Sequence, residues 1–497
     1  MSLVVSRGSL LTTYDLRLTT IFKPMKKLFL ITIFAVTAVS MMAQPARSIK
    51  RGVGENAFTT VEELEILAPG VTWYYNWGID YSSAFSDVVG PDKAIEYMPM
   101  IWGTNYDASR IPADAQYLLG FNEPNLITAG HGGSDITPEQ AVEPWHAIEQ
   151  IAQQKGLQLV APALNYSGDK LNDGKVYSTP EIWFDAFIAA YKAKYGVEPR
   201  YDYLALHSYM NSPQAVLSYV ENFAKKYGKQ VWLTEFCSWE GTVSEASQIN
   251  AMVQKVQLLE QSEWCARYAW FKAKGNNSAP FYRLLVTPGL LDPDKTMKLS
   301  TLGKIYVHMS TFDKNYWWKV GDVIPAKDYI DATAVELSEN TDAESSQPIQ
   351  ISSLGNGCSA SYQIEVPSAG EYTLGMRISS RALIANPKIQ VLCDGTEVAN
   401  QEMPVTGATS AEDKWEGQSI TFNLPAGKHT LTIKNTQSSF VKLNWIALGL
   451  SSGISQIENR GERSEERGER NLFNLAGQRV SKDYKGIVIK NGKRYIK

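Results

Sequence analysis

The stretch Tyr-Leu-Leu-Gly-Phe-Asn-Glu-Pro-Asn at residues 117–125 shows the pattern that organises the first half of the chain. Its apolar run, 117–121, is typical of a strand buried on both faces of a sheet. Pro124 cannot donate a ladder hydrogen bond, so the strand is expected to end before it. Glu123 therefore stands where a buried strand emerges, which is where reactive groups lie in a barrel of parallel strands.

Similar apolar runs recur on both sides of this stretch, with helical patterns between them. The strand candidates are 71–77, 97–102, 117–121, 158–163, 203–207, 230–235 and 268–271, and the helix candidates are 137–155, 180–195, 214–227 and 244–261. Repeated β–α units predict a mostly parallel sheet, an α/β fold of the (β/α)8-barrel type over residues 44–325. The strand candidates are one fewer than a barrel of eight requires. Either one strand is missed or the barrel is short by one.

From about Tyr329 the pattern changes to short alternating runs separated by turn residues. The candidates are 361–366, 372–379, 388–393, 419–424, 429–435 and 441–448. Strands at this spacing predict an all-β sandwich over residues 326–451. The charged repeat GERSEERGER predicts a solvated linker over residues 452–470, and its glycines weaken the alternative of a short exposed helix. Residues 471–497 carry a small β pattern of their own.

The composition is that of a globular protein, with 44% apolar and 20% charged residues in a chain of 497. A net charge of −4 argues against nucleic acid as a partner. Only 5 histidines are present, and neither a catalytic metal nor another catalytic cofactor is predicted. The 13 Trp and 25 Tyr are numerous, and such rings suit stacking on sugars as well as core packing. The sequence predicts no particular oligomeric state.

Residues 1–43 have the features of an N-terminal extension followed by a signal peptide. Met25-Lys26-Lys27 precede an apolar run at 28–39, which is shorter than the ~20 residues that span a bilayer. Ala43 then offers a cleavage site. We expect a bacterial protein that is secreted or held at the cell surface, without a transmembrane segment in the mature chain. The alternative is a buried helix or a membrane anchor.

The 4 cysteines, in an oxidising compartment, allow three pairings. The domain boundaries favour disulfides between Cys237 and Cys265 and between Cys358 and Cys393. The alternative is free buried thiols, which are common. No Cys-x-x-Cys motif supports a zinc site.

A second glutamate, Glu235, ends the apolar strand Val-Trp-Leu-Thr-Glu at 231–235. Burying an unpaired carboxylate is unfavourable, so neither Glu123 nor Glu235 is expected there for packing alone. Two carboxyl groups facing each other suit glycoside hydrolysis, which needs one protonated group and one ionised group. A gap of ~5 Å would give retention of configuration, and a wider gap inversion. The alternative for each is a capping or salt-bridging glutamate in a loop.

Six short motifs, in this order, carry a resemblance to a known family: 75–78 (YNWG), 98–102 (MPMIW), 120–125 (GFNEPN), 161–163 (APA), 207–209 (HSY) and 233–236 (LTEF). Over about 53–310 the chain resembles glycoside hydrolase family 128, whose members are retaining endo-β-1,3-glucanases of clan A. The resemblance implies that Glu123 is the acid/base and Glu235 the nucleophile. It also implies that Asn122 bonds the sugar 2-hydroxyl and that His207 and Tyr209 orient the nucleophile. By our strand count the glutamates end strands three and six, whereas the clan pattern is four and seven.

Three tryptophans, Trp77, Trp102 and Trp270, each end a strand candidate on the rim that holds both glutamates. Rings at this rim are expected to stack on the sugar faces of a polysaccharide. The alternative is that each packs in the core, which is the better interpretation for any single tryptophan.

The second domain resembles carbohydrate-binding modules of families 6 and 35, on residues 361–372 and on VKLNWIAL at 441–448. The resemblance implies a jelly-roll sandwich, a glycan cleft that includes Trp415 in a loop and Asn444, and a structural calcium with Glu336 as a candidate ligand. The alternative is a structural sandwich without a sugar site. The tail, 471–497, resembles C-terminal sorting segments of bacterial type IX secretion cargo. Its alternative is a small strand pair packed on the sandwich.

Together these patterns predict a secreted, retaining endo-β-1,3-glucanase that cleaves β-glucan by double displacement. Two alternatives stay open: a glycan-binding protein without catalysis, and a clan-A hydrolase for another β-glycan linkage.

Overall fold

The computed structural model describes residues 44–275, 280–286 and 297–450, and the backbone of short strands between 472 and 496. The predicted signal peptide and the predicted charged linker lie outside the described residues. Within the described part, no helix is long and apolar enough to cross a membrane.

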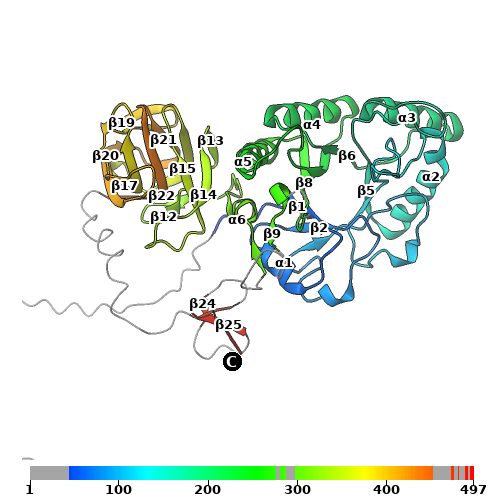
Figure 1. Cartoon of the computed structure of the whole chain (residues 1–497), viewed down its shortest axis with the longest axis horizontal. Helices are drawn as coiled ribbons and strands as arrows, with labels where there is room; N and C mark the ends of the chain where they lie inside the picture. Colours follow the sequence, from blue (N-terminus) through cyan, green and yellow to red (C-terminus); the bar gives the residue numbers. More distant parts are fainter. Residues whose placement is uncertain are drawn as a thin grey trace, which may run out of the picture. The chain divides into compact units, whose positions relative to one another are not determined.

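The first half forms a sheet of eight parallel strands in the order β3-β2-β1-β8-β7-β6-β5-β4 (Figure 1). An isolated parallel bridge joins Met100, just after β3, to Leu119 of β4, and two backbone hydrogen bonds of 2.9 Å flank it. The two edges of the sheet therefore meet, which is how a barrel closes. The strands are β1 (Arg51–Gly54), β2 (Trp73–Tyr75), β3 (Glu96–Tyr97), β4 (Tyr117–Leu119), β5 (Gln158–Leu164), β6 (Tyr203–Ser208), β7 (Val231–Phe236) and β8 (Cys265–Phe271).

The strand that the sequence pattern missed is β1, so the barrel is not short by one. Its sequence, Arg-Gly-Val-Gly, has no apolar run, yet it lies between β2 and β8. Gly52 is required there because a Cβ atom would lie 2.2 Å from the Trp73 ring. The buried Arg51 guanidinium donates to the carbonyls of Tyr306 at 3.0 Å and Ser310 at 2.5 Å. Counting β1, the two glutamates belong to the fourth and seventh strands.

The helices surround the strands because each has one apolar face and clear end signals (Figure 1). Helices α2, α3 and α4 each begin with a proline at the first helical position and end at a left-handed glycine. The α-helices are α1 (Val61–Leu67), α2 (Pro138–Lys155), α3 (Pro180–Tyr195), α4 (Pro213–Tyr227), α5 (Glu245–Gln261) and α6 (Thr301–His308). Short elements complete this half: the 3-10 turns Ser83–Phe85, Ala108–Arg110 and Pro280–Tyr282, and the strands β9 (Leu285–Val286) and β10 (Lys298–Leu299).

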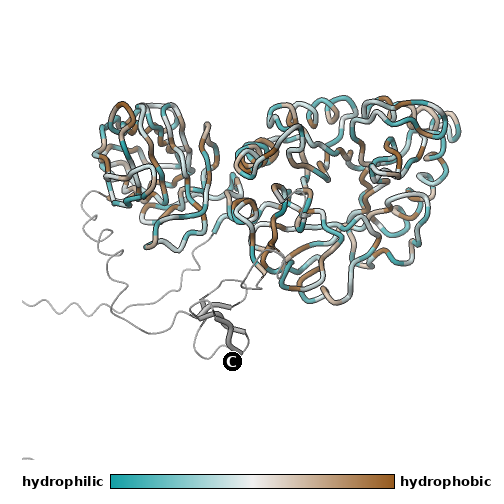
Figure 2. The backbone as a smooth tube through the Cα atoms, in the orientation of Figure 1, coloured by the Kyte–Doolittle hydropathy of each residue, from teal (hydrophilic) through white to brown (hydrophobic). Residues whose placement is uncertain are grey.

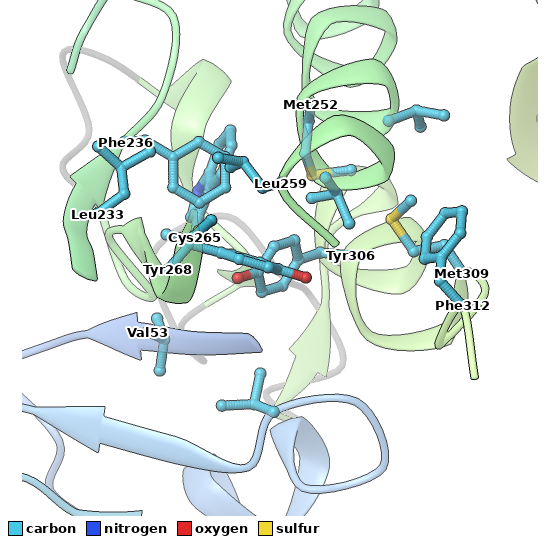
Figure 3. Close-up of a cluster of buried hydrophobic side chains, with 14 of the residues drawn as sticks. Val53, Leu233, Phe236, Met252, Leu259, Cys265, Tyr268, Tyr306, Met309 and Phe312 are labelled. Atoms are coloured by element: carbon cyan, nitrogen blue, oxygen red, sulfur yellow. The ribbon is translucent and has the colours of Figure 1, made fainter. Parts of the chain in front are cut away.

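Two hydrophobic clusters include residues of this half. One contains side chains between the strands and the helices and also residues of the second half, and the other contains side chains from most of the barrel strands. Figure 3 shows part of the first, where Val53 of β1 and Tyr268 of β8 pack with Leu259 of α5 and Tyr306 of α6. The second includes Trp73 and Trp232, whose ring centres are 5.4 Å apart. Because these buried side chains fill the middle of the barrel, any binding site must lie at its ends.

The second half is an all-β region of two sheets, and hydrophobic residues recur along its strands (Figure 2). One sheet has the order β11-β16-β21-β18-β19 with β13 beside β16, and the other β14-β15-β22-β17-β20 with β12 beside β22. The strands are β11 (Trp318–Lys319), β12 (Val323–Pro325), β13 (Asp331–Thr333), β14 (Glu336–Glu339), β15 (Ile349–Ser353), β16 (Ser359–Val366), β17 (Gly370–Ala382), β18 (Lys388–Cys393), β19 (Thr396–Glu402), β20 (Trp415–Leu424), β21 (Gly427–Asn435) and β22 (Ser439–Leu450). Since β11 and β12 pair with β16 and β22, this region draws on strands that precede residue 326.

The tail contains four short antiparallel strands in the order β24-β23-β25-β26. They are β23 (Leu472–Asn474), β24 (Arg479–Val480), β25 (Ile487–Lys490) and β26 (Lys493–Ile496). Its role as a sorting segment stays a prediction.

The predicted disulfides are wrong, because all four cysteines are free thiols. Cys265 begins β8 opposite Val231, whereas Cys237 follows the far end of β7. A strand of this length separates them by roughly 20 Å, and a disulfide needs Cα atoms within ~7 Å. Cys358 and Cys393 belong to strands β16 and β18, or lie next to them, and β21 runs between these strands. Cys265 is instead part of the apolar cluster drawn in Figure 3.

Candidate active site

The two glutamates and a histidine meet at the C-terminal ends of β4, β6 and β7. Glu123, His207 and Glu235 are 6%, 0% and 4% exposed. One carboxyl oxygen of each glutamate and one ring nitrogen of His207 all lie within 4.8 Å of one another. The sequence prediction that the two carboxylates face each other is therefore confirmed by the geometry.

Glu123 is held by an unusual turn at the end of β4. Its φ of 42° is in the left-handed region, which a non-glycine residue adopts at the expense of strain. The Glu123 amide donates to the Ala163 carbonyl at 2.8 Å, which ties the turn to β5. On its side chain, Oε1 accepts a hydrogen bond from Asn165 Nδ2 at 3.1 Å. The backbone thus aims this carboxyl group into the mouth of the barrel.

Glu235 accepts hydrogen bonds on both carboxyl oxygens. Oε1 accepts from the Trp77 indole at 2.8 Å and from the Tyr75 hydroxyl at 3.2 Å. Oε2 accepts from the Tyr209 hydroxyl. The pKa of Glu235 is raised, chiefly by burial and also by the neighbouring Glu123 carboxyl group, although the positive charge of His207 and the Tyr209 and Trp77 hydrogen bonds act to lower it. The donors around this carboxyl group stabilise its anionic form and so counteract the effect of burial.

His207 bridges the two carboxyl groups. Its Nδ1–H donates to Glu123 Oε1 at 2.8 Å and lies 3.5 Å from Glu235 Oε2, while Nε2 contacts Thr234 Oγ1 at 3.0 Å. Burial acts to lower the pKa of His207, but the two carboxylates outweigh it and the pKa is raised. His207 therefore serves both glutamates, and its direct hydrogen bond is to Glu123 and not to the expected Glu235.

Glu123, His207 and Glu235 are also of the ligand types that could hold a metal ion. However, both glutamates already accept hydrogen bonds from nitrogen atoms that are donors only. These are the indole nitrogen of Trp77, which donates to Glu235, and the amide nitrogen of Asn165, which donates to Glu123. These donors favour a site of two carboxyl groups, each hydrogen-bonded to its own neighbours, over a metal centre.

Asn122 and two of the predicted tryptophans lie at this end of the barrel. Asn122 is buried, with its Nδ2 donating to Gly132 at 3.2 Å and its Oδ1 without a partner among the described residues. Its amide donates to the carbonyl of the half-buried Trp102 at 2.9 Å. Trp77 is half-buried as well and, like Glu123, has a positive φ, 58°.

The prediction that Trp270 forms part of the rim is wrong. Its ring is 0% exposed, its indole donates to the Tyr282 carbonyl at 2.7 Å, and it packs edge-on against Phe236. Side chains alternate along a strand, so Trp270 points outward to the helices and its neighbour Phe271 takes the inner position. The Phe271 ring lies 5.9 Å from Trp77 and 5.5 Å from Tyr209.

Four residues near the glutamates were not predicted as site residues. Tyr75 could have been found from strand alternation, because it stands two positions before Trp77 and so shares its side of the strand. Asn165 could have been found because it directly follows the end of β5. Tyr166 is 52% exposed and stacks on Tyr219 at 5.2 Å. Trp239 is 40% exposed and lies edge-on to Tyr209 at 6.2 Å.

The predicted sugar contacts of the second domain fare differently. Trp415 begins β20 and is not in a loop; its ring is half-buried and its indole N–H has no partner among the described residues. Asn444 is 0% exposed, donates to Asp342 at 2.9 Å and accepts from Asn340 and Ser345. Asn444 is therefore a structural residue and its prediction as a sugar contact is wrong.

Glu336 is exposed at the start of β14 and belongs to no group of three His, Cys, Asp or Glu ligands within the described ranges. The calcium site stays a prediction.

Comparisons with known proteins match the two halves separately. The model of the glycosyl hydrolase catalytic core matches residues 52–306, and that of the family 6 carbohydrate-binding module matches residues 325–449. The chain is 31% identical to a solved family 128, subgroup II endo-β-1,3-glucanase from Pseudomonas viridiflava, over 53% of this chain and 98% of that one, with a TM-score of 0.45. A family 128, subgroup VII oligosaccharide-binding protein from Cryptococcus neoformans is 21% identical, over 53% and 96% of the two chains, with a TM-score of 0.38.

A curated relative is Alkali-sensitive linkage protein 1 of Schizosaccharomyces pombe, 27% identical over 253 residues. The match covers 48% of this chain and 40% of that protein, so this chain spans less than half of the relative's length.

Proposed function

The chain belongs to the glycosyl hydrolase catalytic core family, and from that premise we propose that it is a secreted, retaining endo-β-1,3-glucanase. The observation that carries the proposal is the pair of buried carboxyl groups, with oxygens within 4.8 Å, that His207 links. Oxygens this close fit the ~5 Å between the carboxyl groups of retaining enzymes better than the wider gap of inverting ones.

The contacts of the two glutamates support one assignment of roles. Glu235 accepts hydrogen bonds from Trp77, Tyr75 and Tyr209, which favour the anion that a nucleophile must be. Both hydrogen bonds of Glu123, with His207 and Asn165, involve Oε1, so among the described residues no side chain donates to Oε2, where a proton can be held. Glu123 is therefore the group that can be supplied with a proton for the leaving oxygen.

The reaction then proceeds in two displacements. Glu235 attacks the anomeric carbon while Glu123 gives its proton to the departing glycosidic oxygen, which breaks the bond between the two sugars. Glu123 next takes a proton from water, and the hydroxide displaces Glu235 to release a sugar of retained configuration. The unpartnered Oδ1 of Asn122 is available to accept from the sugar 2-hydroxyl.

Aromatic rings near the pair provide sugar platforms. Trp77 and Trp102 are half-buried at the mouth of the barrel, and Tyr166 and Trp239 are more exposed. Tyr166 directly follows Asn165, which contacts Glu123, so we place the leaving-group sugar beside Tyr166. The sandwich domain is proposed to bind the same polysaccharide, with Trp415 as a contact.

The β-1,3 linkage is the most specific part of the proposal, and it is supported by the 31% identity to an endo-β-1,3-glucanase. The test is a product profile of the full chain on laminarin-type β-1,3-glucan and on β-1,4-glucan. We expect oligosaccharides of several lengths from the first only, and no product from Glu123→Gln or Glu235→Gln. Products from β-1,4-glucan alone would change the linkage, and glucan binding without new reducing ends would make the chain a glycan-binding protein.

A further inference from the structure

A buried lysine lies under the loops that follow β6 and β7. Lys255 is in the middle of α5 and 1% exposed, on the same face as the buried Met252 and Leu259. Its ammonium donates to the Met210 carbonyl at 2.6 Å and to Ser238 Oγ at 2.8 Å. Both groups are neutral, so neither compensates the charge as a carboxylate would. An ammonium in such a place is unfavourable for folding, and an apolar residue would suit this helix face better.

The two groups that Lys255 contacts belong to the loops that carry site residues. Met210 directly follows Tyr209, whose hydroxyl donates to Glu235 Oε2. Ser238 lies three residues after Glu235 and directly before Trp239. Lys255 therefore joins the chain beside Tyr209 to the chain beyond Glu235.

Other contacts connect the same two loops above the lysine. The Trp239 amide donates to the Tyr209 carbonyl at 3.0 Å, and Asn211 exchanges hydrogen bonds with Glu240. Gln248 of α5 binds both the amide and the carbonyl of Ser238, at 2.8 and 3.1 Å. Lys255 supplies the charged donor of this set, as Glu240 supplies a charged acceptor, and hydrogen bonds with a charged partner are the strongest kind.

We propose that Lys255 is a positioning residue, which clamps the β6 and β7 loops so that the Tyr209 hydroxyl stays on the Glu235 carboxylate. The clamp acts on the placement of Tyr209 and touches no substrate. Its catalytic consequence rests on the proposed function of Glu235, and it holds for any glycan linkage that the site cleaves.

The charge state of Lys255 fits this role at neutral pH. Burial lowers the pKa of Lys255 to about 8, opposed by the neighbouring Cys237 and Glu240, so most of the ammonium is still charged at pH 7. The clamp is expected to weaken above that pH.

The first test measures the loops without any substrate. Lys255→Met keeps the length of the side chain and removes the donors, and Lys229→Met, at an exposed lysine, is the matched control. Hydrogen exchange of the full chain should become faster at the amides of residues 211 and 238–240 in Lys255→Met and stay unchanged in the control. Ser238→Ala, which removes one of the two contacts, should give a smaller change of the same kind. Unchanged exchange in Lys255→Met overturns the clamp, whatever the chain hydrolyses.

The second test is a double-mutant cycle on the cleaved glucan. Lys255→Met should lower kcat about 10-fold with KM nearly unchanged and with an equal or higher melting temperature, because a buried charge has been removed. In the Tyr209→Phe background the same change should lower kcat less than about twofold, since the two residues act through one contact. Full additivity, or unchanged kcat in Lys255→Met, overturns the positioning role. A wild-type chain that cleaves no glycan contradicts the proposed function, and the exchange test still decides the clamp.

Discussion

Replacing Tyr209 by phenylalanine removes one hydroxyl from the site and leaves the ring in place. That hydroxyl is the donor to Glu235 Oε2, while Trp77 and Tyr75 both serve Oε1. Glu235 is 4% exposed, so water cannot readily replace the lost donor. A hydrogen bond to a buried charged group contributes about 1.5–3 kcal/mol. We therefore expect kcat/KM to fall roughly 10- to 100-fold, at about 1.4 kcal/mol per factor of ten.

The same substitution should change the pH profile. As the proposed nucleophile, Glu235 must be ionised to attack, so activity should be lost as the pH falls through its pKa. Burial already raises that pKa and the Tyr209 hydrogen bond lowers it, so removing the bond raises it further and moves the acid limb of kcat/KM to higher pH. A shift to lower pH would have the wrong sign for this account.

The assay is release of reducing sugar from β-1,3-glucan across the pH range, with melting temperatures to confirm folding. Tyr227→Phe is the matched control, because its hydroxyl donates to a carboxylate, Asp185 Oδ1 at 2.8 Å, on the surface of the barrel. That control should leave kcat/KM and the acid limb where they are. Wild-type kcat/KM in Tyr209→Phe would refute the view that this hydroxyl holds the nucleophile.

The geometry leads to four further predictions. Glu123→Ala should abolish glucan hydrolysis but keep measurable cleavage of an aryl glycoside whose leaving group needs no proton, and added azide should accelerate that cleavage; equal losses on both substrates would contradict its role as acid. Trp270→Phe should lower the free energy of unfolding by about 1–3 kcal/mol, through the lost indole hydrogen bond, and leave KM within twofold of the wild-type value. Tyr166→Ala should instead leave stability unchanged and raise KM about 3- to 10-fold. Thiol titration of the mature chain in denaturant, without reductant, should find four reactive thiols, and fewer would restore a disulfide.

The sequence predicted the architecture because the spacing of apolar residues differs between buried strands, helices and half-exposed strands. Apolar runs and helical patterns indicated the α/β barrel and then the all-β region, and the motifs indicated the family. The sequence pattern missed the strand β1 because the conformation of that strand depends on tertiary contacts. Gly52 makes room for the Trp73 ring and Arg51 is satisfied by carbonyls from distant segments, and neither leaves an apolar run in the sequence.

The site was predictable where it depends on strand ends, and not where it depends on side-chain direction. Glu123 and Glu235 were found because each follows an apolar run. Trp270 was misassigned because a strand end alone does not show which face of the sheet a side chain takes. In the structure Phe271, and not Trp270, points to the inside of the barrel. The cysteine pairing failed for a related reason, since Cys237 and Cys265 are near in sequence but lie at opposite ends of neighbouring parallel strands.

The proposed mechanism requires Glu235 to form a covalent bond to the sugar. Incubating the full chain with a 2-deoxy-2-fluoro β-1,3-linked oligosaccharyl fluoride slows the second displacement and should trap the intermediate. Loss of fluoride should leave a mass increase of one 2-deoxy-2-fluoro-oligosaccharyl group, located by peptide mapping on Glu235 and absent from Glu235→Gln. An adduct on Glu123, or hydrolysis of glucan with inverted configuration and no adduct, would contradict it.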